Sequence, residues 1–299
     1  MSELLVVLVD CNSATWEGIE SEGNRVSFPE FCASLLLFLS AFTSTHRRNR
    51  LMVLGYNSVE GGYLLLPTPD VTATLSVSDH MRPASYCPSL EASFWRLRYG
   101  SAPREADPSS GGGGGSGDGS YSAPASPALP PLSRSLASLT SCLNLALCSL
   151  NARRGALAGS PASTRLVCFH SSPDPLGQYI AFNNGARSAH HMGVVIDSVV
   201  LGAMPSVFLQ QAAHQTGGLY LHPATELHKG LLHYFLHLLL PPAELRTEIH
   251  LPPRTSVNLK AHCLCHKRFC ETAFMCTTCL SLWCQASAVC PACSTSSKE

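Results

Sequence analysis

Apolar positions follow the chain in blocks that predict strands and helices in turn. The run 4–9 is apolar throughout and rich in valine, which is typical of a strand buried in a parallel sheet. Over 28–45 the apolar residues recur at helical spacing, with Pro29 in the first turn, where proline is well tolerated. The segment 51–56 predicts a second strand, and 63–66 predicts a third that runs antiparallel to it.

The second half of the chain continues this alternation. Helices are expected at 132–152, 176–192, 206–216 and 224–240, and strands at 165–169, 193–200 and 219–221. Gly217-Gly218 is a stop signal, because glycine adopts the left-handed conformation that ends many helices. The alternation predicts an α/β fold in which helices cover both faces of a mostly parallel sheet. Such sheets bind ligands at the carboxyl ends of their strands.

Residues 101–131 interrupt the pattern. They contain five successive glycines and a run rich in serine, proline and alanine. This composition cannot bury a core, so we expect a flexible insert. A phosphate-binding loop is not expected, because no Gly-Lys-Ser/Thr follows the glycines. The chain is therefore expected to divide into a body over 1–242, which carries the insert, and a C-terminal module over 243–299.

The C-terminal module contains eight of the chain's fourteen cysteines. Four of them form two Cys-x2-Cys knuckles: Cys276, Cys279, Cys290 and Cys293. Each knuckle can present two thiolates to a tetrahedral zinc ion. A looser set lies around them, with two histidines as candidate nitrogen ligands: Cys263, Cys265, Cys270, Cys284, His262 and His266. Which of Cys265, Cys270 and His266 completes this set is open at this point. We expect one or two structural Zn²⁺ ions, without which so few large apolar residues could hardly fold.

Zinc explains these cysteines better than disulfides do. Met1-Ser2-Glu3 carries no basic residue and Asp10 follows the first apolar run, so the N-terminus does not predict an export signal. The other cysteines are scattered through apolar stretches, as expected of buried reduced thiols: Cys11, Cys32, Cys87, Cys142, Cys148 and Cys168. A catalytic zinc is not expected, because all-sulfur sites are normally closed. No apolar run approaches the length that a membrane span needs.

Charge and motifs do not predict an enzyme or a nucleic-acid-binding protein. Twenty basic and twenty acidic residues give a formal net charge of zero, whereas nucleic-acid-binding domains carry a strongly basic face. The sequence has no Walker-type loop and no Gly-x-Ser-x-Gly elbow. His233 and His237 lie four residues apart on a predicted helix, as His228 also does, but without the glutamate of metalloproteases.

Several segments resemble one known family. They are 5–16 (LVVLVDCNSATW), 174–179, 193–201 (GVVIDSVVL), 209–221 (LQQAAHQTGGLYL) and 274–284 (FMCTTCLSLWC). These segments resemble the family of the smaller von Willebrand A-type subunit in the core of general transcription factor IIH. The resemblance covers nearly the whole chain except 67–131. Cys270 is additional to the ligand set that is usual in this family.

The resemblance implies a von Willebrand A-like, Rossmann-like domain followed by a four-cysteine-type zinc module. It implies a non-catalytic scaffold in the nucleus that supports initiation by RNA polymerase II and nucleotide excision repair. The implied partners are the larger von Willebrand A subunit, whose own zinc domain docks on this one, and the other core subunits, including the helicases. Neither sequence-specific nucleic acid nor a membrane is expected as a partner.

The loop after the first predicted strand is a degenerate magnesium site. In von Willebrand A domains this loop reads Asp-x-Ser-x-Ser and supplies oxygen ligands to Mg²⁺. Here Asp10 is kept and Asn12 still offers an oxygen, but Ala14 offers none. Asp174, after a later strand, is a candidate second carboxylate. We favour the interpretation that Asp10 and Asn12 satisfy backbone groups of the loop. Residual Mg²⁺ binding is the alternative.

Two other functions stay open on the sequence alone. One is a RING-type ubiquitin ligase, although the gap from Cys279 to Cys284 and the Cys263-x-Cys265 start fit its eight ligand slots poorly. The other is a metal-dependent von Willebrand A binding module, against which Ala14 argues.

Overall fold

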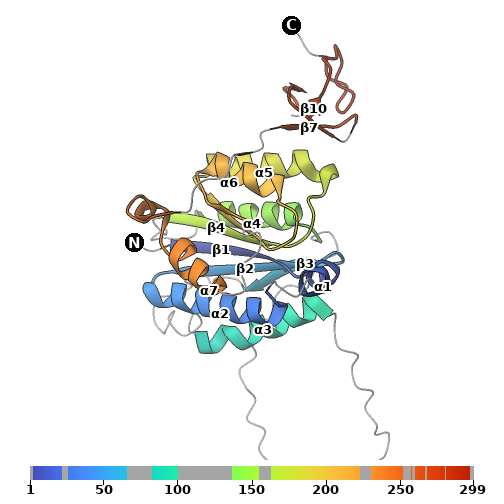
Figure 1. Cartoon of the computed structure of the whole chain (residues 1–299). Coiled ribbons are helices and arrows are strands. Elements are labelled where there is room, and N and C mark those ends of the chain that lie inside the picture. Colours follow the sequence, from blue (N-terminus) through green and yellow to red (C-terminus); the bar gives the residue numbers. More distant parts are fainter. Residues whose placement is uncertain are drawn as a thin grey trace, which may run out of the picture.

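The computed structural model describes most of the chain in several stretches (Figure 1). The described residues are 3–21, 26–65, 83–99, 137–154, 163–222, 230–251, 257, 260–266, 268–279 and 281–296. The predicted insert at 101–131 and His228 lie outside these residues. So do the first residues of the helices predicted at 132–152 and 224–240.

Six strands form the central sheet in the order β3-β2-β1-β4-β5-β6. They are β1 (Glu3–Asp10), β2 (Arg50–Tyr56), β3 (Gly61–Leu65), β4 (Ser163–His170), β5 (Val195–Val200) and β6 (Tyr220–Leu221). Every pairing is parallel except that of β2 with β3, which confirms the prediction of a mostly parallel sheet. The strand order reverses between β1 and β4, and doubly wound sheets usually bind ligands at such a point.

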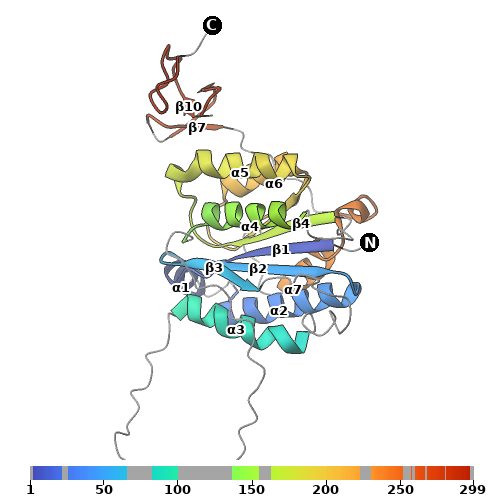
Figure 2. The same cartoon turned by 180° about the vertical axis from the view of Figure 1, so that it is seen from behind.

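Helices cover both faces of the sheet (Figures 1 and 2). One face carries α1 (Ser13–Ser21), α2 (Phe28–Thr45), α3 (Pro83–Tyr99), α7 (Leu231–Tyr234) and the π-helix η4 (Phe235–Leu239). The other carries α4 (Leu139–Arg154), α5 (Tyr179–His191) and α6 (Val207–Thr216). Each face buries its own apolar cluster against alternate residues of the strands, for example Val7 on one side and Leu8 on the other.

The helix α2 has the bounds that its sequence predicts. The Ser27 hydroxyl accepts from the Glu30 N–H at 3.5 Å, and the Glu30 carboxylate accepts from the Ser27 N–H at 3.1 Å, which forms a capping box. By length and composition alone α2 could cross a membrane. Its face through Phe31 and Leu35, however, is buried in the core of the body.

Some predicted elements differ from those observed. The helix predicted at 176–192 divides into the short 3-10 helix η2 (Leu176–Gln178) and α5. The end of the helix predicted at 224–240 is an α-turn followed by a π-helix. The helices α1 and α3 were not predicted from the apolar pattern.

A buried ionic network fixes the segment that leaves the body. The Arg165 guanidinium donates to Glu3 at 2.9 Å and to the Pro241 carbonyl at 2.9 Å. Arg246, in the 3-10 helix η5 (Ala243–Thr247), donates to both carboxylate oxygens of Asp197, at 2.8 and 2.5 Å. Burial raises the pKa of Glu3, although the Arg165 charge acts in the opposite direction. These charges are paired inside the fold, so the start of the C-terminal segment is held firmly.

The C-terminal module is built from short strands and lies beyond α5 and α6 (Figure 1). Its strands are β7 (Ala261–Cys263), β8 (Arg268–Cys270), β9 (Phe274–Met275) and β10 (Leu282–Trp283). β7 pairs with β8 and β9 pairs with β10, both antiparallel.

Candidate metal centres

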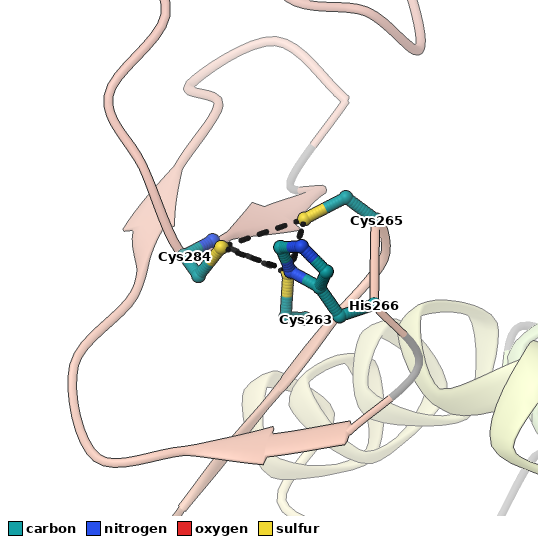
Figure 3. A group of neighbouring side chains, drawn as sticks. All are labelled: Cys263, Cys265, His266 and Cys284. Atoms are coloured by element: carbon teal, nitrogen blue, oxygen red, sulfur yellow. Dashed lines mark hydrogen bonds between the residues drawn. The ribbon is translucent and has the colours of Figure 1, made fainter.

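The first candidate centre is the inner group, which consists of Cys263, Cys265, His266 and Cys284 (Figure 3). Cys263 ends β7, Cys265 and His266 occupy the following turn, and Cys284 directly follows β10. The Leu264 N–H donates to the Leu282 carbonyl at 3.0 Å, which joins the turn to β10. The four ligand atoms lie within 4.8 Å of one another.

Three sulfurs and one imidazole nitrogen make the inner group a suitable zinc site. The His266 Nδ1 lies 3.1 Å from the Cys265 sulfur and 3.2 Å from the Cys284 sulfur. Burial opposes ionisation of the Cys263 thiol, but hydrogen bonds from Cys265 and His266 outweigh it and lower its pKa to about 5. The hydrogen bonds that Cys284 makes with Cys265 and Cys263 raise its pKa to about 11. A cation bound among these sulfurs would favour their thiolate forms.

The second candidate centre is the outer group, which consists of Cys276, Cys279, Cys290 and Cys293. The Cys276 sulfur lies 3.7 Å from that of Cys293, and the Cys279 sulfur lies 3.7 Å from that of Cys290. A zinc ion with Zn–S bonds of about 2.3 Å holds its sulfur ligands about 3.8 Å apart at the corners of a tetrahedron. The two knuckles therefore face each other at the spacing that a four-cysteine zinc site needs.

The structure separates the candidates that the sequence left open. Cys265 and His266 both belong to the inner group. The Cys270 thiol instead donates to the Ala261 carbonyl at 3.3 Å, across the β7–β8 pair, and belongs to neither group. The side chain of His262 lies outside the described residues. Along the chain the two groups interleave, because Cys276 and Cys279 of the outer group precede Cys284 of the inner group.

Asp10 lies at the carboxyl end of β1, at the switch point of the sheet. Its Oδ2 accepts from the backbone N–H groups of Ser171 at 3.1 Å and Ser172 at 2.9 Å, and its Oδ1 accepts from the Asn12 N–H at 3.1 Å. The His170 Nδ1 lies 3.2 Å from the same Oδ2. Burial raises the pKa of the Asp10 carboxyl, but the hydrogen bond and charge of His170, with the backbone donors, bring it below its ordinary value.

Asp174 is also occupied by donors from the protein. Its Oδ1 accepts from the Ser206 hydroxyl at 2.5 Å, and its Oδ2 accepts from the Phe208 N–H at 3.1 Å at the start of α6. The Asn12 amide donates to the Ser172 hydroxyl at 3.2 Å. Both candidate carboxylates, Asp10 and Asp174, therefore accept hydrogen bonds from backbone or hydroxyl groups of the protein.

Sequence reasoning missed His170, which connects these groups. Its ring is 2% exposed, its Nδ1 lies 2.9 Å from the Tyr56 hydroxyl, and its Nε2 lies 3.9 Å from Asp174 Oδ1. The signal was available, because His170 directly follows the predicted strand 165–169, as Asp10 directly follows the predicted strand 4–9. The pairing of β1 with β4 brings the two side chains together, and this pairing could not be read from the sequence.

Comparison with known proteins relates the chain to one family. Residues 130–294 match the family model described as "Transcription factor Tfb4". The chain is 27% identical to "General transcription and DNA repair factor IIH subunit TFB4" of Arabidopsis thaliana over 97% of its own length and 87% of the relative's. It is 28% identical to the protein of the same description from Schizosaccharomyces pombe, over 98% of this chain and 88% of that one.

Among solved structures, the chain is similar to one titled "Crystal Structure of the TFIIH p34 N-terminal Domain". The TM-score is 0.56 at 18% identity, and the match covers 79% of this chain and 97% of the other. At this level of identity the similarity shows the fold alone, a von Willebrand A-like arrangement of sheet and helices.

Proposed function

This chain belongs to the Tfb4 family of transcription factors, and from that premise we propose that it is the smaller von Willebrand A-type subunit of the core of transcription factor IIH. In this role it is a scaffold in the nucleus that supports initiation by RNA polymerase II and nucleotide excision repair. The observation that carries the proposal is the match, over nearly the whole chain, to relatives named as subunits of general transcription and DNA repair factor IIH. That match favours a non-catalytic subunit over a RING-type ligase or a metal-dependent adhesion module.

The inner and outer groups each hold one structural Zn²⁺ ion in this proposal. The inner ion is held by three cysteines and His266, and the outer ion by four cysteines. Cys270 is not a ligand, since its thiol is directed to the Ala261 carbonyl. The support is the donor chemistry and the spacing of the outer sulfurs. Small cysteine-rich modules generally draw their folding free energy from the metal.

The body, 1–242, serves as a rigid platform for the other core subunits, among them the larger von Willebrand A subunit and the helicases. At the switch point the carboxylates of Asp10 and Asp174 accept hydrogen bonds from protein groups, so we expect docking that does not depend on a bound metal. A platform that is already ordered loses little conformational entropy when a partner docks. The module, 243–299, offers a second contact, where Phe274 is 54% exposed and Val289 is 51% exposed.

Affinity purification of the tagged full chain from nuclear extract, followed by mass spectrometry, tests this function. We expect a second von Willebrand A subunit and the helicases to be recovered in stoichiometric amounts, with or without MgCl₂. An Ala14→Ser variant, which restores one oxygen ligand, should recover the same set. Recovery of the chain alone, or of membrane adhesion proteins, would contradict the proposal. Autoubiquitination by the purified chain would instead support the ligase.

A further inference from the structure

The start of the module is held on the body by the Arg246–Asp197 pair. Among the described residues from 260 onward, the contact with the body lies next to β7 and β10. The Lys260 carbonyl, just before β7, accepts from the Gln211 amide of α6 at 3.4 Å. The Tyr179 hydroxyl of α5 in turn donates to the Gln211 Oε1 at 3.1 Å. Leu282, in β10, packs against the apolar cluster that includes Phe182 of α5 and Leu209 of α6. The receiving surface is therefore the outer face of α5 and α6.

The residues that make this contact are direct neighbours of the inner ligands. Lys260 precedes the strand that ends at Cys263, and Leu282 lies two residues before Cys284. The Cys284 N–H donates to the Cys263 sulfur at 3.3 Å, so both ligands belong to one hydrogen-bonded unit. An ion bound by Cys263 and Cys284 would fix β7 against β10 and, with them, the surface that faces α5 and α6.

The outer group contributes little to the contact. Next to this group, the Arg187 guanidinium of α5 lies 3.9 Å from the Met275 sulfur, and Met275 remains 44% exposed. A cavity of about 210 Å³ lies on the outer group instead, lined by Phe274, Trp283 and Pro291 among others. The two metal groups thus face different surroundings.

We propose that the inner group is a latch: its metal ion holds the C-terminal module on the α5–α6 face, whereas the outer ion shapes only the distal end of the module. This inference rests on the proposed zinc binding of both groups. With the latch closed, the module has one orientation on the body and presents its distal surface in a fixed direction. With the inner ion removed, β7 and β10 separate and Leu282 loses its support. The part of the module from 260 onward is then joined to the body only through the preceding segment, which the Arg246–Asp197 pair still holds.

Pulsed electron paramagnetic resonance on the full, zinc-loaded chain can test the latch. The spin labels are attached to genetically encoded ketone side chains, because cysteine labelling would modify the candidate ligands. They replace Arg47 in the body and Thr272 in the module, which are both exposed. We expect one narrow distance distribution for the wild-type chain. Cys284→Ser should broaden it, whereas Cys293→Ser, which lies after the last inner ligand, should leave it narrow. Atomic emission should find two zinc ions per wild-type chain and one in either variant.

A second pair of variants separates docking from metal binding. Leu282→Ser should broaden the distance distribution while both zinc ions remain bound, because it removes the apolar contact but no ligand. Val289→Ser, at an exposed position in the same module, should leave the distribution narrow. A narrow distribution in Cys284→Ser, or equal broadening in Cys293→Ser, would overturn the latch. A wild-type chain without zinc would overturn both the proposed zinc sites and the latch. A chain with two zinc ions whose distance distribution does not respond to Cys284→Ser would overturn the latch alone.

Discussion

Replacing Asp10 by alanine should destabilise the body strongly, because the carboxylate holds together the ends of two strands. It is 1% exposed and accepts from the backbone N–H groups of Asn12, Ser171 and Ser172, with His170 alongside. In Asp10→Ala these donors lose their acceptor at once. A buried donor left unpaired costs about 1–3 kcal/mol.

The three N–H groups are not equally buried, which sets the expected size of the loss. The bond from Ser171 is buried, whereas those from Asn12 and Ser172 are partly buried, so water can replace the acceptor there. The full penalty then falls on Ser171 and the His170 ring, and relief of the buried charge offsets part of it. We therefore expect a loss of about 3 kcal/mol in the free energy of unfolding.

Urea unfolding of the zinc-loaded chain, followed by far-UV circular dichroism, measures this loss. Glu248→Ala is a suitable control, because Glu248 is exposed and its removal should change the unfolding free energy by less than about 0.5 kcal/mol. The measurement is repeated with MgCl₂ in large molar excess over the protein. An unfolding free energy of Asp10→Ala equal to that of the control would contradict a structural role for the carboxylate. So would stabilisation by MgCl₂ of the wild-type chain but not of the variant.

Three further outcomes follow from buried groups of the body. The pKa of Asp10 is lowered in the folded protein, so its carboxylate should contribute its full stabilisation at pH values above the ordinary pKa of 3.8. This stabilisation should be lost as the pH falls below 3.8, which urea midpoints measured across the acid range would show. Phe235→Ala should lower the free energy of unfolding by about 3–5 kcal/mol, because its ring is fully buried with its centroid 4.9 Å from that of Phe169. Tyr234→Ala, at the exposed neighbouring position, is the control and should lower it by less than about 1 kcal/mol in the same urea assay. Arg246→Ala removes a partner of the buried Asp197 carboxylate and should lower the free energy of unfolding by about 3 kcal/mol. Thermal unfolding measures this loss, and a variant as stable as the wild type would contradict it.

The positions of the strands along the chain could be predicted because each buried strand is a short apolar run between polar loops. The helix α2 was equally clear, since its early proline and its apolar spacing agree. The helix α1 was missed because only Trp16 and Ile19 are buried on it. The helix α3 contains Pro88, and proline inside a helix argues against helix at the level of sequence.

The members of the two candidate metal groups were only partly predictable. Knuckle spacing marks the outer group, because two residues between cysteines suffice for both sulfurs to reach one ion. The choice of His266 over Cys270 depends on the pairing of β7 with β8, which sets Ala261 opposite Cys270. No local pattern contains that register. The same holds for His170 and Asp10, which meet only because β1 and β4 are neighbours in the sheet.

The most direct test of the account is the metal content of the intact chain, measured by native mass spectrometry after purification without added chelator. We expect a mass increase that corresponds to two zinc ions, with all fourteen cysteines free of disulfides, and a single zinc ion in Cys284→Ser. A metal-free chain, or one whose C-terminal cysteines are joined in disulfides, would contradict it.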